Sequence, residues 1–189
     1  VSGALLENTG LYERLSARDN LEFYGRVWHI SQNERTQRMK ELLTSLDLWQ
    51  RKDEVISGWS KGMKQKLAIA RTLFHRPQLI FLDEPTNGLD PVAAAELREY
   101  LADLTHRDGV TIFLTTHNLN EAEKLCDRVA VIRQGKIIAS GSPADLQARK
   151  DETILQISCT GLTDSVINSL RFSEGIKQVT ITQEGLLVS

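Results

Sequence analysis

The chain has 189 residues, is 41% hydrophobic and carries a formal net charge of -2 at pH 7. This length and apolar content allow one globular domain with a small appendage and exclude a disordered tail. The near-neutral charge gives no reason to expect a nucleic-acid partner, and no apolar run approaches the roughly 20 residues that a membrane-spanning helix needs.

The first part of the chain is predicted to be a strand followed by helices. Residues 1–6 form the expected strand. Ser16 can cap a first helix, and Ser31 followed by Glu34 is a capping-box pattern that predicts a second. Residues 16–50 are therefore expected to be helical.

A strand with helices on either side is expected next. Ser60 precedes a helical run that Pro77 ends. The continuous apolar run 79–82 predicts a strand buried on both faces of a parallel sheet. Asp90 can then cap a helix whose first residue is Pro91.

The third part continues the alternation of strand and helix. A strand over 110–115 and a helix over 119–125 lead to a third apolar run, 129–132, which is expected to add a strand to the same sheet. The pair 134–135 is predicted to turn the chain into a hairpin. A short helix is expected over 143–150.

The alternation predicts an α/β fold with a doubly wound parallel sheet, in which ligands bind at the carboxyl ends of the strands. Asp83 and Glu84 follow one such end, and His117 follows another. Residues 150–189, with strands expected near 153–160 and 179–189 around a short helix, are interpreted as a separate accessory module.

The adjacent acids Asp83 and Glu84 are the first candidate site. Two carboxylates at the end of a buried strand are costly unless a cation, water or donor satisfies them. In phosphoryl transfer one acid holds Mg²⁺ and a second positions or deprotonates the attacking water, so Asp83 fits the first role and Glu84 the second. The alternative is that both acids only cap the following turn.

Two further segments are candidate phosphate contacts. His117 ends the neighbouring strand and could touch a γ-phosphate, or it is a capped surface histidine. Ser60, Lys61 and Gly62 open a helix, whose free amides and positive dipole end bind anions. Alone, that segment is a weak signal.

In order and spacing these segments resemble the ATPase domain of ABC transporters. The segment 60–65 matches the signature, 79–84 the Walker B strand, 87–90 the D-loop, and His117 the switch histidine. The resemblance covers residues 1 to about 149. It implies a P-loop NTPase-type α/β fold with a helical subdomain over about 16–73 and a small α+β C-terminal extension.

The resemblance implies ATP and Mg²⁺ as ligands. It also implies a second ATPase domain, because two such domains sandwich two ATP molecules head to tail. Ser60 and Gly62 would then act on the partner's nucleotide, and Asp90 would link the two sites. Transmembrane permease subunits are the other implied partners, which puts the protein at the cytoplasmic face of the membrane as a peripheral subunit.

Two segments depart from the commonest family form. The signature reads Trp-Ser-Lys-Gly-Met, in which Lys61 adds a charge and Met63 replaces an amide. Such changes resemble those in ATPases of drug, antibiotic or polysaccharide exporters. Glu7 falls where the family's Q-loop glutamine contacts the metal and the membrane subunit, and its alternative role is that of an ordinary loop acid.

The third departure concerns the phosphate-binding loop. No Gly-x-x-x-x-Gly-Lys-[Ser/Thr] pattern occurs in the 189 residues. In family members this loop and the first strands of the sheet precede the Q-loop. We therefore expect the phosphate-binding loop to precede Val1, and we expect the chain alone to hydrolyse no ATP. The alternatives to a transporter ATPase are a soluble ABC ATPase of repair or ribosome-associated type and a non-catalytic regulatory remnant.

Overall fold

The structure is a computed structural model that describes residues 2–148, 155–157, 164–171, 173, 176, 179–182 and 185–188. The chain divides by compactness into two units, Val1–Leu125 and Cys126–Ser189. The candidate residues named above all belong to the first unit. The boundary expected near residue 149 from the family resemblance stays a prediction.

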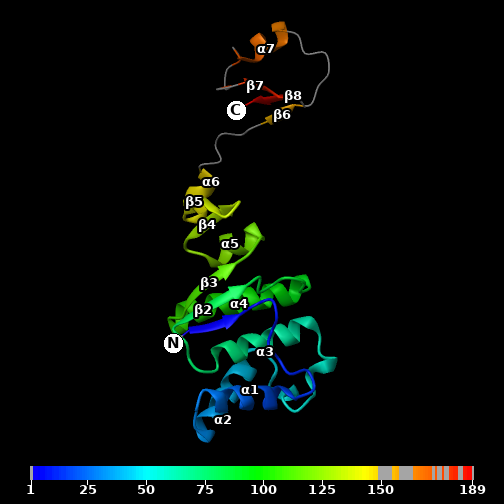
Figure 1. Cartoon of the computed structure of the whole chain (residues 1–189), viewed down its shortest axis with the longest axis vertical. Helices are drawn as coiled ribbons and strands as arrows, with labels where there is room; N and C mark the ends of the chain where they lie inside the picture. The colour runs from blue at the N-terminus through cyan, green and yellow to red at the C-terminus, as the bar shows by residue number, and fades with distance from the viewer. Residues whose placement is uncertain are drawn as a thin grey trace. The chain divides into compact units, whose positions relative to one another are not determined.

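A three-stranded parallel sheet forms the centre of the first unit (Figure 1). Its strands are β1 (Ser2–Leu5), β2 (Leu79–Asp83) and β3 (Thr111–Thr115), in that spatial order. The register aligns Leu5 with Leu82 and Leu82 with Leu114. All three carboxyl ends therefore lie at one edge of the sheet, which confirms the expected parallel α/β arrangement in this part of the chain.

Three helices separate β1 from β2 in the chain: α1 (Ala17–Val27), α2 (Gln32–Ser45) and α3 (Lys61–Leu73), with short 3₁₀ turns at Trp49–Arg51 and Ile56–Gly58. Each helix begins at the serine that the sequence indicated. The hydroxyls of Ser16, Ser31 and Ser60 accept hydrogen bonds from the amide three residues ahead. Figure 1 shows α3 lying between the sheet and the pair α1 and α2, and contacts of α3 with β1 and with both helices agree.

The connection from β2 to β3 is the helix α4 (Pro91–Asp108). Asp90 caps it through Oδ1, which accepts the amides of Val92 at 3.1 Å and Ala93 at 2.9 Å. Pro91 occupies the first turn, and Gly109, with φ of 63°, ends the helix in the left-handed region. A short helix, α5 (Leu119–Leu125), follows β3.

One hydrophobic core holds the first unit together. It includes buried leucines, isoleucines and alanines of α1, α2, α3 and α4 together with Leu5, Ile80 and Leu82 of the sheet. The face of the sheet that carries these three residues is therefore covered by helices. Burial of this kind is the main favourable contribution to folding, at about 25 cal/mol per Å² of apolar surface.

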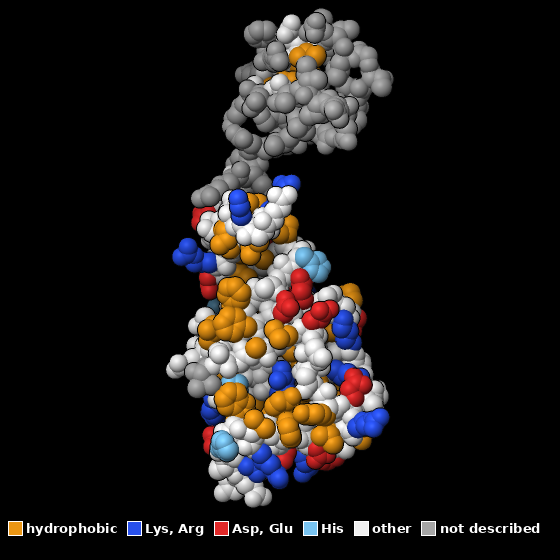
Figure 2. Space-filling view, in the orientation of Figure 1, with side chains coloured by type: hydrophobic (Ala, Val, Ile, Leu, Met, Phe, Trp, Pro, Cys, Tyr) orange, Lys and Arg blue, Asp and Glu red, His pale blue; other side chains and the backbone are white. Residues whose placement is uncertain are grey.

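The opposite face of the sheet does not match the expectation of a strand buried on both sides. Phe81 is 41% exposed and Phe113 59% exposed, and their rings lie 5.7 Å apart. A continuous apolar run is compatible with one or two covered faces, so the sequence pattern could not tell these cases apart. Figure 2 shows apolar side chains at the surface of this part of the molecule.

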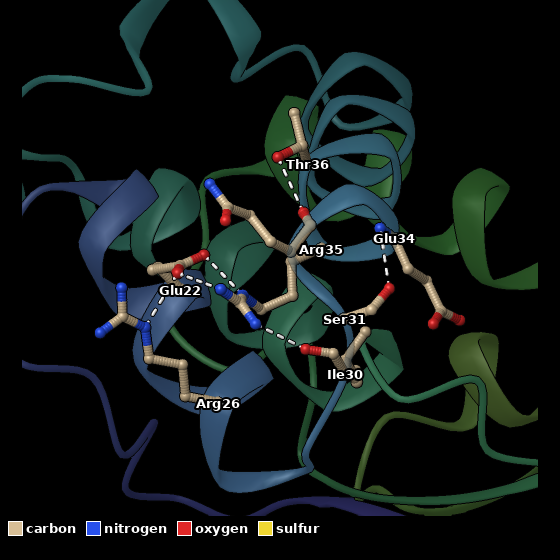
Figure 3. A network of polar contacts seen from close by, with 8 residues as sticks. Glu22, Arg26, Ile30, Ser31, Glu34, Arg35 and Thr36 are labelled. Atoms are coloured by element: carbon tan, nitrogen blue, oxygen red, sulfur yellow. Dashed lines mark hydrogen bonds and ion pairs between the residues drawn. The ribbon is translucent and has the colours of Figure 1, made fainter.

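An ion-pair network joins α1 to α2 (Figure 3). Glu22 accepts bonds from Arg35 Nε at 2.9 Å and Arg35 Nη2 at 2.7 Å, and also from Arg26 Nε at 2.9 Å. Hydrogen bonds with Arg35 lower the pKa of Glu22 and outweigh the opposing effect of its burial. Arg35 crosses α1 at Gly25, where a Cβ would lie 2.5 Å from Arg35 Cδ and 2.7 Å from Phe74 Cε1.

The second unit contains a hairpin and an α+β part. The hairpin pairs β4 (Val129–Arg133) with β5 (Lys136–Gly141), and α6 (Pro143–Ala148) follows. The described remainder is β6 (Leu155–Ile157), α7 (Asp164–Arg171), β7 (Val179–Thr182) and β8 (Gly185–Val188), with strand order β6-β8-β7.

Two expectations for the second unit were wrong in detail. The run 129–132 was expected to join the parallel sheet, whereas β4 pairs with β5 as a separate antiparallel sheet of two strands. The segment 179–189 was expected to be one strand and forms two, β7 and β8, which pair with each other. The expected turn at Gln134 and Gly135 is present, with φ of 51° and 72°.

None of the helices in the described part of the chain has the length and apolar character of a membrane-spanning helix.

Gly25→Ala is expected to reduce the free energy of unfolding by about 1–2 kcal/mol, because the added methyl overpacks against Arg35 and Phe74. Helix propensity alone predicts the opposite sign, a gain of about 1 kcal/mol. Urea unfolding of the 189-residue chain, followed by far-UV circular dichroism, measures the difference. Gly58→Ala is the matched control, since nothing lies within 4 Å of a Cβ there; equal stability of the two variants would contradict the packing argument.

Candidate functional site

The carboxyl edge of the parallel sheet brings three of the predicted residues together. Asp83 ends β2, Glu84 follows it, and His117 lies two residues after the end of β3. The hydroxyl of Thr115, aligned with Asp83 in the β2–β3 register, donates a short hydrogen bond to Asp83 Oδ1. The two strands thus present an acid, a second acid and an imidazole side by side.

The backbone of Glu84 leaves the strand in an unusual conformation. Its φ is 48°, in the left-handed region that costs a non-glycine residue about 1–2 kcal/mol. Two hydrogen bonds hold it there: its amide donates to the Thr115 carbonyl at 3.0 Å, and its carbonyl accepts the Asn87 amide at 3.0 Å. Strain of this kind is found at functional sites, where the surrounding structure fixes it.

The side chains of Glu84 and His117 contact each other. His117 Nδ1 donates to Glu84 Oε1 at 2.7 Å, with Glu84 30% exposed and His117 77% exposed. This hydrogen bond, together with the charge of Glu84 and then that of Glu121, raises the pKa of His117 above its ordinary value of 6.5. A carboxylate bonded to an imidazole can accept a proton from water while the second ring nitrogen stays available for a ligand.

The residues at this edge fit a magnesium ion bound together with phosphates. Asp83 is half-buried, and its Oδ1 is oriented by Thr115. Among the described residues there is no group of three or more His, Cys, Asp or Glu that could hold a metal unaided. Mg²⁺ typically binds one or two carboxylates and completes its octahedral shell with water and substrate phosphates. One oriented carboxylate therefore suits this mode of binding.

Glu7 lies at the same edge of the sheet as the two acids. β1 ends at Leu5, which is aligned with Leu82, so Glu7 leaves β1 beside the end of β2. Its side chain is exposed, and no described hydrogen bond or ion pair engages it. The position is compatible with the predicted metal contact, which stays a prediction.

The signature segment lies at the start of α3. Ser60 Oγ accepts the Met63 amide at 3.2 Å, and a Cβ on Gly62 would lie 3.2 Å from the Cβ of Ala93. The sulfur of Met63 accepts a hydrogen bond from Arg51 Nη1 at 3.5 Å. No hydrogen bond or ion pair between described residues joins the segment 60–63 to the acids or the histidine of the sheet edge.

Three residues in or near the site were not assigned a role from the sequence. Thr115 could have been found from the parallel register, which puts it opposite Asp83. Gln65 Nε2 donates a hydrogen bond to the Pro85 carbonyl at 2.8 Å. No short sequence pattern predicts this tertiary contact. Glu121 is buried, and its carboxylate oxygens have no hydrogen-bond partner among the described residues. A buried acid of this kind gives no distinguishing sequence pattern.

Comparisons of the chain with known proteins point to one family. A family model described as "ABC transporter" matches residues 2–87. The linearmycin resistance ATP-binding protein LnrL of Bacillus subtilis (strain 168) is 33% identical over 180 residues, which cover 95% of this chain and 58% of that protein. These matches relate the chain to the ATP-binding domains of ABC transporters.

Two further ABC relatives agree with this assignment. The bacitracin transport ATP-binding protein BcrA of Bacillus licheniformis is 34% identical over 165 residues, covering 87% of this chain and 53% of BcrA. The solved structure of cbiO1 from Clostridium perfringens, part of the ABC transporter complex cbiONQ, has a TM-score of 0.71 at 26% identity. It covers 91% of this chain and 63% of cbiO1. The ABC chain thus spans about half the length of the curated relatives it matches.

The raised pKa of His117 makes a prediction for this ABC chain. The imidazole is expected to titrate above 6.5, and Glu84→Gln is expected to move its midpoint down toward that value. The pair stabilises the fold fully below the ordinary pKa of histidine, and the contribution is lost as pH rises through the raised pKa. A ¹H–¹⁵N NMR titration of the histidine ring measures the midpoint. His106, on α4, serves as the internal control, and an unchanged His117 midpoint in the variant would contradict the contact.

Proposed function

We propose that this chain belongs to the ATP-binding and ATP-hydrolysing subunit of an ABC exporter. The single observation that carries the proposal is the Glu84–His117 pair at the carboxyl edge of the sheet, with Nδ1 and Oε1 2.7 Å apart. An acid that directly follows a strand, fixed in a strained turn and bonded to an imidazole, has the arrangement of a general base with its orienting partner.

In this proposal each residue of the sheet edge has a different role in ATP hydrolysis. Glu84 orients the attacking water and accepts its proton. His117 holds the Glu84 carboxylate through Nδ1 and offers Nε2 to the γ-phosphate. Asp83, oriented by Thr115, and Glu7 would hold Mg²⁺, which neutralises charge that develops on the phosphate oxygens when it is bound.

The signature segment is proposed to act on the nucleotide held by a second ATPase domain. Three observations support this role. Ser60 and Gly62 stand at the N-terminus of a helix of 13 residues, where amides and dipole favour an anion. The first turn of that helix contains no acid, and Lys61 adds a positive charge. Met63 and Asp90 would complete the surface against the partner domain.

Two observations favour export as the direction of transport. The signature carries Lys61 and Met63, and these departures from the commonest form resemble those in exporter ATPases. The similar proteins include ATP-binding proteins named for linearmycin resistance and bacitracin transport. We infer an ATPase subunit that works with transmembrane permease subunits at the cytoplasmic face of the membrane, with the helical region 16–73 and Glu7 on the side that receives them.

Glu84→Gln is expected to lower the ATPase rate of the complete subunit by about a hundredfold or more, because the amide cannot accept the proton from water. Magnesium binding through Asp83 survives, so the variant is expected to accumulate as an ATP-bound dimer. Phosphate release and size-exclusion chromatography with ATP and Mg²⁺ measure the two effects.

Glu99→Gln is the control for that experiment, since Glu99 is an exposed acid of α4, away from the sheet edge. It is expected to hydrolyse ATP at the unaltered rate. Near-normal hydrolysis by Glu84→Gln would refute the assignment of Glu84 as the base.

A further inference from the structure

The side chain of Lys61 lies on the backbone of Gly88. A Cβ built on Gly88 would stand 2.1 Å from Lys61 Nζ, 3.3 Å from Cε and 3.6 Å from Cδ. Gly88 has a φ of 69°, a backbone conformation that favours glycine, and the atom nearest to its Cβ position is the end of the Lys61 side chain. The end of the lysine therefore occupies the place that any other residue at position 88 would fill.

A second contact joins the same helix to the same loop. Gln65, one helical turn after Lys61, donates from Nε2 to the carbonyl of Pro85 at 2.8 Å, and Pro85 is itself buried. Lys61 and Gln65 thus contact residues 88 and 85, on either side of the turn that follows Glu84. The loop 85–88 is held from one side by α3.

The loop in turn fixes the backbone of Glu84. The Asn87 amide donates to the Glu84 carbonyl at 3.0 Å, and the Leu89 amide donates to the Thr86 carbonyl at 3.2 Å. These two bonds close consecutive turns between Glu84 and the helix cap at Asp90. Gly88 lies in the second of these turns and directly follows Asn87, which closes the first, so a displacement of Gly88 would act through Asn87 on the left-handed conformation of Glu84.

The position of Lys61 is not explained by favourable electrostatics within its helix. A positive charge in the first turn opposes the helix dipole, at a cost of about 0.3–1 kcal/mol. No ion pair between Lys61 and a described carboxylate compensates for it. Lys64, in the same turn, instead pairs with Glu13 at 2.8 Å. Among the described residues, the Lys61 side chain is therefore not held in place by an ion pair.

We propose that Lys61, assisted by Gln65, is a positioning residue for Glu84, which acts by packing its side chain onto Gly88 and holding the 84–88 turn closed. The proposal rests on the proposed function for its catalytic consequence, but the packing itself does not depend on it. Because Lys61 belongs to the segment proposed to face the partner's nucleotide, this contact mechanically joins that segment to the base that serves the chain's own nucleotide.

Amide hydrogen exchange in the 189-residue chain tests the packing without ATP. Lys61→Ala is expected to speed exchange of the Asn87 and Leu89 amides by about fivefold or more, since the loop opens more often. Lys61→Met keeps a side chain that reaches the ε position, 3.3 Å from the Cβ position of Gly88, and is expected to leave exchange unchanged within about twofold. Lys64→Ala removes a lysine from the same turn and is the matched control. Unchanged exchange in Lys61→Ala would overturn the proposal.

A double-mutant cycle tests whether the two residues act on each other. Gly88→Ala is expected to speed the same exchange, because its methyl displaces Lys61 and because alanine disfavours positive φ. In Lys61→Ala/Gly88→Ala the methyl finds the space vacated, so the combined effect is expected to be smaller than the product of the single effects. Independent effects that multiply would overturn the contact.

Hydrolysis by the complete subunit tests the catalytic consequence. Lys61→Ala and Lys61→Met both remove the charge of the signature segment, but only Lys61→Met keeps the packing on Gly88. The kcat of Lys61→Ala is therefore expected to be about tenfold lower than that of Lys61→Met, with KM differing between them by less than about twofold. A changed KM with unchanged kcat would overturn the positioning role. If the unaltered subunit hydrolyses no ATP, the proposed function fails while the exchange measurements still decide the packing, so the two failures are distinguishable.

Discussion

The hydrogen bond from the Glu84 amide to the Thr115 carbonyl is the contact on which the site depends. It extends the parallel ladder of β2 and β3 by one residue beyond the last paired strand position, at the point where the chain turns into the left-handed region. The sheet can therefore hold a strained residue without a glycine. The helices hold the sheet in turn, because α3 packs on β1 and α4 connects β2 to β3.

Most of the local structure could be predicted because its causes are local. A serine or aspartate oxygen that accepts an amide two or three residues ahead defines a helix start within a few residues of sequence, and Ser16, Ser31, Ser60 and Asp90 all do so. The apolar run that forms β2 and the glycine turn at 134–135 are signals of the same short range. These signals fixed the order of elements but not their pairing.

The features that the sequence did not predict all depend on what lies across space. Phe81 alternates with Ile80 and Leu82 in one apolar run, and only the packing of the helices separates the buried pair from the exposed ring. The run that forms β4 reads like a sheet strand, yet its partner is its own hairpin neighbour. In the site, the acids and the histidine were predicted from strand ends, whereas the Gln65–Pro85 bond joins residues 20 positions apart that have no periodic relation.

Ser60 illustrates how one oxygen atom can serve two purposes. Its hydroxyl accepts the Met63 amide and so starts α3, while the hydroxyl proton remains able to donate to an anion, which a carboxylate cap could not do. Loss of this side chain would weaken the helix start and remove the donor that the proposed anion contact needs. On the proposed function, selection for a stable helix and selection for an anion-binding signature therefore act together at this position, and tolerance to substitution there measures their sum.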